Sequence, residues 1–337
     1  MNPDVNIIIL NWNGWEDTVE CLESLYQNEY DNYSVILVEN GSEDNSLEKI
    51  NEYCRGELKL SSKFFNYQTD NKPIKFIEID ENEASKIKIA DENLIIIKNR
   101  RNQGFARGNN LGIKFALNNF HPDYILLLNN DTVVHPKFLI ELINIAQSND
   151  EIGFTGPKTY LYDNENVIQA AGGGNIDFLM GESQEVAFME KDNEKFDKNV
   201  EIEYVGGSCL LVKREVIEKI GLLDENYFMY WEDVDWCFNG REAGYKSIYS
   251  PKSKIWHKYG TSSQNYFKTY YHNRNRIYFM RKHSPQISYR KFRNHYLKEI
   301  LKESGYQLIY QRNWKLFKSL VKGTIEGFRL TPHKKPV

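Results

Sequence analysis

The stretch YILLLNND at residues 124–131 does most to decide the fold of this chain. Five apolar residues in a row are typical of a β-strand that is buried on both faces of a sheet. The polar residues Asn129, Asn130 and Asp131 follow where such a strand would end. In an open parallel sheet, ligands bind beyond the carboxyl ends of the strands. The stretch therefore predicts a core strand that leads directly into a binding site.

Outward from this stretch, apolar runs at residues 5–10, 34–38 and 94–98 repeat the strand pattern. Helix-like patterns lie between the runs, over residues 46–53 and 105–120 among others. Strands that alternate with helices pair in parallel through right-handed crossovers. We therefore predict an α/β, Rossmann-like fold, with a mostly parallel central sheet and helices on both faces.

The chain divides into segments of different texture. Residues 1–145 carry the strand and helix rhythm, which a polar stretch at 55–92 interrupts; we interpret that stretch as an insertion at the sheet edge or over the site. Residues 146–280 contain glycine-rich turns and many aromatic residues, and are expected to form one wall of a cleft with added strands and short helices. Residues 281–337 are predicted to form a helical extension.

Composition limits the class of protein. The chain has 337 residues, of which 41% are hydrophobic and 27% charged, enough for a sizeable core. No run approaches 18 apolar residues, and the first residues lack a basic start and a cleavage site, so neither a membrane span nor a secretory signal is expected. Four widely spaced cysteines fit a reducing cytoplasm. Collagen, coiled-coil, disulfide-scaffold and disordered classes are excluded.

The net charge of −4 conceals an asymmetry. Residues 281–337 hold 14 Lys and Arg against 3 Asp and Glu, whereas the remainder holds 29 against 44. Apolar residues of this tail share a helical face with lysines and arginines between them, which predicts a basic amphipathic helix. Such a face could contact a membrane surface. It could instead dock on the rest of the chain, or on a second copy, which would make the protein a homo-oligomer. No nucleic-acid partner is expected.

Four polar clusters follow the predicted strands. A tryptophan at a strand end, Trp12, offers a stacking face for a planar base, and Gly104 lets the backbone approach a phosphate. Arg107 supplies positive charge, and Asp131 is suited to a hard divalent cation. The alternatives are that Trp12 covers the core and that Asp131 caps a helix. Neither a GxGxxG nor a GxxxxGK[ST] motif is present, so dehydrogenase and P-loop sites are not expected.

A second group of candidate functional residues lies in the stretch YFMYWEDVDWCF, at residues 227–238. Three carboxylates, Glu232, Asp233 and Asp235, stand among six aromatic residues. Like charges beside apolar walls are expected to raise the pKa of at least one carboxylate. The alternative is a helix start, where acids are favoured by the helix dipole. His257 follows a short strand-like segment, and a lone histidine is more often a satisfied polar residue than a ligand.

These motifs together resemble family 2 glycosyltransferases with the GT-A fold, and most closely the rhamnosyltransferase-like members. The resemblance covers residues 4–280. It rests on ordered motifs: ILNWNG, VENGSEDNS, NQGFARGNNLGI, LLLNNDTVV, GGSCLLVKREV and LDENYFMYWEDVDWCFNGREAGY.

The resemblance implies a role for each matching position. Residues 1–145 would bind the nucleotide sugar and residues 146–280 the acceptor. Asp233 matches the general base; Asp131, in the position of the family's Asp-x-Asp motif, and His257 match metal ligands. Positions that would contact the acceptor are Glu232, Asp235 and Trp231. Positions that would contact the nucleotide sugar are Leu10, Asn11, Trp12, Glu39, Asn40, Asn102, Gly104, Arg107, Asn110, Asn129 and Asn130. Asn129 and Glu39 each replace an aspartate of the family pattern.

The implied activity is an inverting, Mg²⁺- or Mn²⁺-assisted transfer from a nucleotide-diphosphate sugar. The donor would resemble dTDP-rhamnose or a UDP-hexose, and the acceptor a glycan or lipid-linked glycan. Such an enzyme would be cytoplasmic, with contact at the inner face of the cell membrane. Two rivals are a non-catalytic binding subunit with the same fold and a nucleotidyltransferase. The second lacks a basic, glycine-rich loop after the first strand.

Overall fold

The structure is a computed structural model that describes residues 2–84, 86–87, 94–258, 260 and 265–332. The strands are β1 (Val5–Asn11), β2 (Tyr33–Glu39), β3 (Phe76–Asp80), β4 (Leu94–Lys98), β5 (Tyr124–Asn129), β6 (Thr132–Val134), β7 (Ile152–Leu161), β8 (Asn164–Ala171), β9 (Gly173–Asp177), β10 (Glu182–Glu185), β11 (Glu190–Lys191), β12 (Val200–Ile202), β13 (Tyr204–Val205), β14 (Cys209–Lys213) and β15 (Lys246–His257). The helices are α1 (Trp15–Leu25), α2 (Ser46–Arg55), α3 (Gly104–Asn119), α4 (Phe138–Gln147), η1 (Glu194–Phe196), α5 (Arg214–Ile220), α6 (Glu232–Glu242), α7 (Asn265–His283), α8 (Gln286–Gly305), η2 (Tyr306–Tyr310) and α9 (Trp314–Arg329).

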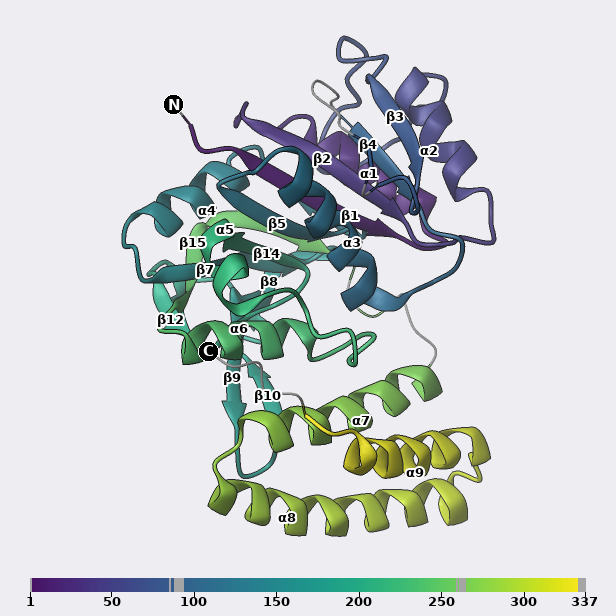
Figure 1. Ribbon diagram of the computed structural model, residues 1–337, viewed down its shortest axis with the longest axis vertical. Helices are drawn as coiled ribbons and strands as arrows, with labels where there is room; N and C mark the ends of the chain where they lie inside the picture. The colour runs from purple at the N-terminus through teal and green to yellow at the C-terminus, as the bar shows by residue number, and fades with distance from the viewer. Residues whose placement is uncertain (1, 85, 88–93, 259, 261–264, 333–337) are drawn as a thin grey trace.

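One twelve-stranded sheet runs through the upper part of the molecule (Figure 1). Its main path is β11-β8-β7-β14-β5-β1-β2-β4-β3. Off this path, β15 pairs with β7, and both β6 and β12 pair with β15. The strands from β5 to β3 are parallel, as the sequence predicts. From β14 outward the pairs are antiparallel, except that β15 runs parallel to β7. The α/β fold is confirmed, and the sheet is mixed because the second half adds antiparallel strands.

The apolar strands of the first half are buried on both faces. Along β1, Ile8 belongs to the core cluster that includes α3, whereas Ile7 and Ile9 belong to the opposite cluster with α1, α2 and α4. Successive side chains of a strand point to opposite faces, so a continuous apolar run satisfies both layers. Each such side chain contributes about 1.5–3 kcal/mol on burial. This core fixes where the strands end.

The predicted insertion contains β3, which pairs with β4 as the outermost parallel strand. Part of the 55–92 segment therefore lies at the sheet edge. Residues 85 and 88–92 of this segment lie outside the described residues.

Part of the second half lies in a small sheet apart from the main one. β9, β10 and β13 form a separate three-stranded antiparallel sheet. Gly173 and Gly174 permit this pairing, because an added Cβ would lie 2.1 Å from the Tyr204 carbonyl oxygen or 2.2 Å from that of Gln184. This small sheet lies within residues 146–280, where a cleft wall was predicted.

Helices α7, α8 and α9 lie together below the sheet domain (Figure 1). The predicted boundary at residue 281 falls inside α7, which begins at Asn265. α9 packs closely on α7: an added Cβ at Gly323 would lie 2.5 Å from the Tyr270 carbonyl oxygen, and one at Gly327 would lie 2.7 Å from that of Arg274. Among the helices in the described ranges, none has the length and apolar character needed to cross a membrane.

Candidate active site

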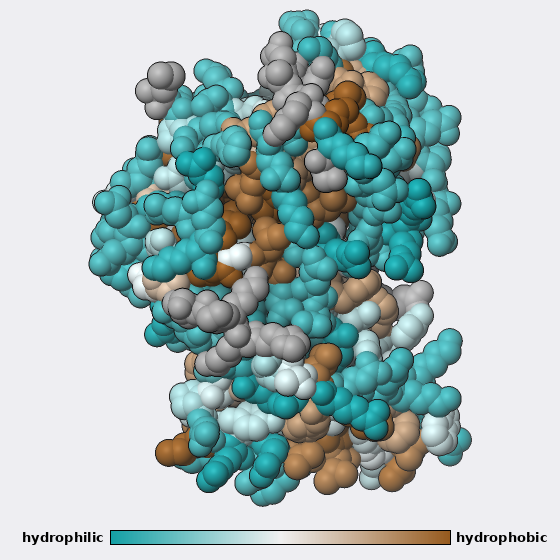
Figure 2. Space-filling model, viewed as in Figure 1, coloured by the Kyte–Doolittle hydropathy of each residue, from teal (hydrophilic) through white to brown (hydrophobic). Residues whose placement is uncertain are grey.

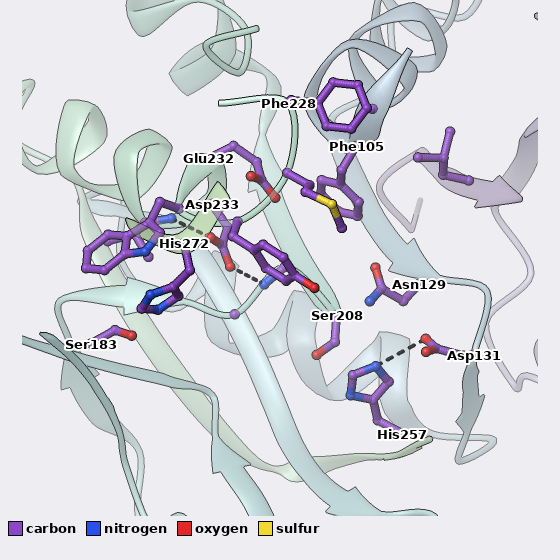
Figure 3. A pocket seen from close by; sticks show the side chains of 18 of the residues that line it. Phe105, Asn129, Asp131, Ser183, Ser208, Phe228, Glu232, Asp233, His257 and His272 are labelled. Carbon is purple, nitrogen blue, oxygen red and sulfur yellow. Dashed lines mark hydrogen bonds and ion pairs between the residues drawn. The ribbon is translucent and has the colours of Figure 1, made fainter. Parts of the chain in front are cut away.

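A cavity of about 880 Å³ opens between the ends of the parallel strands and the loop before α6. Figure 3 shows side chains of the strand ends and of α6 pointing into it from opposite sides. The sequence-predicted residues that line it are Leu10, Trp12, Asn40, Asn102, Gly104, Asn129, Asn130, Asp131, Trp231, Glu232, Asp233 and His257. Residues far apart in the chain therefore meet at one site.

The first group of lining residues, which we call the cation end, consists of Trp12, Asp131 and His257. Antiparallel pairing of β15 with β6 sets His257 opposite Thr132, which brings its ring beside Asp131. The distance from His257 Nε2 to Asp131 Oδ1 is 3.1 Å (Figure 3). His257 Nδ1 lies 2.8 Å from Gln169 Oε1, so with the amide oxygen as acceptor the ring proton is on Nδ1.

This arrangement leaves two electron-rich atoms facing each other. The contact between Asp131 and His257 has the distance of an ion pair, but Asp131 Oδ1 is buried and has no hydrogen-bond donor among the residues that the structure describes. Two lone pairs repel each other unless a proton or a cation lies between them. No cluster of three or more His, Cys, Asp or Glu side chains suited to a metal occurs in the described ranges. Asp131 and His257 could supply two ligands to a cation that completes its shell with phosphate oxygens and water.

Two alternatives for this end do not match the structure. Asp131 does not cap a helix, since α4 begins at Phe138 with Lys137 before it. Trp12 does not cover the core: it is 48% exposed and lines the cavity. Its ring is free to stack on a planar ligand.

The second group, which we call the acid end, consists of Glu232, Asp233 and the preceding loop at residues 227–231. Phe228, Tyr230 and Trp231 all adopt positive φ, at 65°, 67° and 76°. Each such non-glycine residue costs about 1–3 kcal/mol, so the surrounding structure must hold the loop in place.

Two neighbours hold this loop. Fully buried Asn275 of α7 places its Nδ2 within 2.8–2.9 Å of the carbonyl oxygens of Tyr227, Met229 and Tyr230. On the other side, the Phe105 N–H of α3 donates to the Phe228 carbonyl at 2.6 Å. An added Cβ at Gly104, which has φ of +82°, would lie 2.5 Å from the Phe228 ring. The loop thus joins the strand-end side of the cavity to α7.

The two acids at the start of α6 differ in their surroundings. Asp233 Oδ2 accepts a hydrogen bond from Gly207 N–H at 2.7 Å, and its Oδ1 accepts from Val234 N–H at 2.8 Å. Burial raises the pKa of Asp233, and these two N–H groups oppose the rise by stabilising the carboxylate. Glu232 Oε2 is buried without a partner, and burial together with Asp233 raises its pKa well above the usual range. Asp233 is therefore the carboxylate of this pair that ionises more readily.

Asp235 does not join this group, although the sequence grouped it with the acceptor contacts. Two residues along a helix correspond to about 200° of rotation, so its side chain points away from that of Asp233. It is completely buried, with Lys282 Nζ and His283 Nε2 each 2.8 Å from its oxygens. Burial acts to raise the pKa of Asp235, but these two partners hold it below its usual value. Asp235 joins α6 to α7, and the helix-start alternative also holds for the three acids.

Four other predicted residues do not line the cavity. Asn11 Oδ1 accepts from Thr18 Oγ1 at 2.9 Å, and Glu39 Oε1 accepts from Ser42 N–H at 2.9 Å, so both are buried supports of strand-end turns. Asn110 forms reciprocal hydrogen bonds with the backbone of Leu223, at 2.9 and 3.1 Å.

Arg107 lies outside as well. Its side chain is 59% exposed and lies 3.8 Å from Glu225, on the rim of a second cavity. It lies on the solvent side of α3, whereas the buried Ala106 and Gly108 face the core. The sequence assigned these helix positions to the ligand without a way to tell which side of the helix each occupies.

Several lining residues were missed. Ser183 and Glu185 of β10 and Tyr204 of β13 form the far wall, and His272 comes from α7. Burial and the nearby Asp233 raise the pKa of Glu185 to about 7. Burial and Arg276 lower the pKa of His272 to about 4. The short polar strand ESQE carries no periodic signal, so no pattern in the sequence indicated these residues.

Known proteins resemble this chain in sequence. The sequence profile of Glycosyl transferase family 2 matches residues 6–221, and that of Glycosyl transferase family group 2 matches residues 124–325. The chain is 24% identical to the low-salt glycan biosynthesis hexosyltransferase Agl10 of Haloferax volcanii, over 49% of this chain and 53% of that protein. It is 27% identical to the N-acetylglucosaminyl-diphospho-decaprenol L-rhamnosyltransferase of Mycobacterium tuberculosis, over 40% of this chain and 47% of that protein. The chain thus spans about half the length of these two relatives.

A solved structure shares the fold. The mannosyltransferase PcManGT from Pyrobaculum calidifontis, in complex with GDP-Man and Mn²⁺, superposes with a TM-score of 0.57 over 97% of this chain and 88% of that one. The sequence identity is 11%, so this likeness shows the GT-A fold alone.

Proposed function

The chain belongs to glycosyl transferase family 2, and from that premise we propose that it is an inverting glycosyltransferase. It would transfer a sugar from a nucleotide-diphosphate sugar to a hydroxyl group of a glycan or lipid-linked glycan. The observation that carries the proposal is that Asp131 and Asp233 line one cavity of about 880 Å³. A cavity of this size accommodates a sugar nucleotide and part of an acceptor.

The donor would occupy the cation end. Exposed Trp12 offers a stacking face for the base, and Leu10 adds apolar contact beside it. Asn102 and Gly104 line the same side, where the backbone comes close enough to approach a ribose or a phosphate. dTDP-rhamnose is the first candidate donor, with a UDP-hexose second. The mycobacterial relative's name, a rhamnosyltransferase, supports that order.

Asp131 and His257 would hold Mg²⁺ or Mn²⁺. The unpartnered Asp131 Oδ1 and the facing His257 Nε2 fit a cation with carboxylate and imidazole ligands. When bound, such an ion acts as a Lewis acid that stabilises negative charge on a leaving diphosphate. The carboxylate of Asp131 brings negative charge to this end, and Gln169 keeps the His257 ring oriented.

Asp233 would act as the general base. Its carboxylate, fixed by the Gly207 and Val234 N–H groups, would accept the proton of the acceptor hydroxyl as that oxygen attacks the anomeric carbon. A bond forms between the acceptor oxygen and the anomeric carbon, and the bond to the diphosphate oxygen breaks with its electron pair. Attack from the face opposite the leaving group inverts the anomeric carbon. Protonated Glu232 would donate a hydrogen bond to the acceptor.

A lipid-linked acceptor would bring the protein to the inner face of the cell membrane, with contact through the C-terminal helices. The relative named for a decaprenol-linked substrate supports this part of the proposal.

The test is nucleotide release measured across a panel of sugar nucleotides, with and without Mn²⁺. We expect one donor to support metal-dependent release that a chelator abolishes. Donor binding without release or transfer, with any acceptor tried, would instead favour the non-catalytic binding subunit.

A further inference from the structure

Helix α8 carries an outward face rich in exposed apolar side chains. Ile287 and Leu301 are 72% and 73% exposed, and Leu297 is 42% exposed. On the opposite side of the helix, Phe292 and Tyr296 are completely buried within the helical unit, by which we mean helices α7, α8 and α9. Large apolar side chains exposed in one group mark an interaction site rather than ordinary surface.

The same face is strongly basic. Among the described residues, none of its exposed cations forms an ion pair: Arg290, Lys291, Arg293, Lys298 and Lys302. The two acids of α8 are engaged elsewhere. Glu299 pairs with Arg276 at 2.9 Å, and Glu303 accepts a hydrogen bond from Gln307 at 2.8 Å. The outward face therefore carries positive charge that nothing on the helix neutralises.

The pattern continues beyond α8. Along η2 and the start of α9, the exposed residues Tyr306, Ile309, Tyr310 and Trp314 are joined by Arg312, Lys315 and Lys318. Figure 2 shows hydrophobic side chains among hydrophilic ones over the helices at the bottom of the view. We call this surface, from Ile287 to Lys318, the α8 face.

The α8 face overlaps the face that the sequence indicated only in η2 and the start of α9, for example at Ile309, Lys315 and Lys318. Of the apolar residues that the pattern placed together in α9, Leu320 is buried, and Phe328 packs on the core. Gly323 and Gly327 let this side of α9 lie directly on α7. The apolar side of α9 is therefore packed within the chain, which leaves the α8 face available to an outside partner.

We propose that the α8 face is a docking surface for an anionic lipid bilayer. Charge complementarity identifies the partner, because lysines and arginines interleaved with Trp, Tyr, Ile and Leu suit a headgroup layer of phosphates above acyl chains. The proposal deepens the lipid-linked acceptor of the proposed function. Vesicle binding does not depend on turnover, so the two can fail separately.

The helical unit connects this surface to the cavity. Arg276 of α7 forms two hydrogen bonds with Glu299 of α8, both at 2.9 Å, and Tyr296 donates to Asn273 at 3.1 Å. The N-terminal half of α7 lines the cavity with Phe267 and His272. Docking would therefore hold the cavity at a set distance from the bilayer.

The test is flotation of the full chain with vesicles of phosphatidylcholine alone or of equal parts phosphatidylcholine and phosphatidylglycerol. We expect binding to the mixed vesicles only, weakened as salt is added. The triple variant Lys291→Gln, Lys298→Gln, Lys302→Gln should lower the partition coefficient about 100-fold, since each cation near the surface contributes about a factor of 5. The matched control, Lys59→Gln, Lys137→Gln, Lys198→Gln, removes the same charge from exposed lysines of the sheet domain and should bind as the parent does.

The apolar contribution is tested by Ile287→Ser with Leu301→Ser, which should lower partition about 10-fold or more. Thermal unfolding and nucleotide release without vesicles should match the parent, since both residues are exposed and far from the cavity lining. Equal losses in the control and α8 triple variants would overturn the proposal, as would absence of binding at low salt. So would a dimer in solution that the Ile287→Ser and Leu301→Ser changes dissociate, because a second copy would then cover the face.

Discussion

The two ends of the cavity are built in different ways. The cation end sits on strand termini that a doubly buried sheet fixes, and His257 reaches Asp131 through β-sheet pairing. The acid end sits on a loop with three non-glycine residues at positive φ and on buried carboxylates with raised pKa values. The strand ends of the cation end can be predicted from local sequence patterns. The acid end is held in place by contacts from helices that are distant in the sequence. Where a site stores strain and buried charge, its supports matter as much as its chemical groups.

The largest expected effect is at the acid end. Asp233→Asn should lower turnover about 10³-fold or more, because the amide cannot accept the acceptor proton. Donor affinity, measured by calorimetry with Mn²⁺, should stay within about twofold, since the proposed donor position is at the other end of the cavity. Weaker donor binding with normal turnover would contradict this role.

Asp235→Asn is the matched control on the same helix. It removes the closer charge partner of buried Lys282 and leaves only Asp224 at 3.4 Å, so the free energy of unfolding should fall by about 3 kcal/mol. Chemical denaturation should detect this loss. A purely chemical defect with unchanged stability would mean that Asp235 acts in the reaction after all.

At the cation end, Asp131→Ala should weaken Mn²⁺-dependent donor binding about 100-fold. Folding should be unaffected, since Asp131 Oδ1 accepts no hydrogen bond. Calorimetry with and without Mn²⁺ checks this, with Asp163→Ala, an exposed acid outside the cavity lining, as the control. Unchanged donor affinity in the presence of Mn²⁺ would contradict the proposal that a metal binds at the cation end.

A smaller effect should come from the support of the acid end. Asn275→Ala deletes the amide that contacts three loop carbonyls, so the loop loses the geometry that presents Asp233. Turnover should fall about 10-fold at nearly constant donor affinity, a split that a general loss of stability would not produce. Equal losses in both would show that Asn275 supports the whole fold rather than the acid end.

The smallest effect concerns stability alone. The pKa of Glu185 is raised from 4.5 to about 7, so between these values the folded state binds more protons than the unfolded state, and stability falls as the pH rises. Glu185→Gln removes the titrating carboxyl group, and with it this loss of stability at higher pH. The variant should be more stable than the parent above pH 7, by up to about 3 kcal/mol, and equal to it below the unfolded pKa of 4.5. Thermal unfolding across this range would contradict the assignment if the difference did not depend on pH.

The sequence predicted the first half of the molecule well because its signals are local. Continuous apolar runs predicted β1, β2, β4 and β5, and the polar residues at their ends predicted much of the cation end.

It could not predict features set by long-range packing. The strand that carries Glu185 is polar and has no period, and α7 presents Asn275 to a loop 45 residues away in the chain. Arg107 and Asp235 were of the right residue type but lie on the wrong side of their helices, which a motif alone does not reveal.

The most direct test of the account is a crystal structure with Mn²⁺ and a non-hydrolysable analogue of the donor that the panel identifies. We predict the metal between Asp131, His257 and the diphosphate, with the anomeric carbon of the sugar facing Asp233. A nucleotide bound elsewhere, or a sugar directed away from Asp233, would contradict the central claim that the two ends act on one monosaccharide.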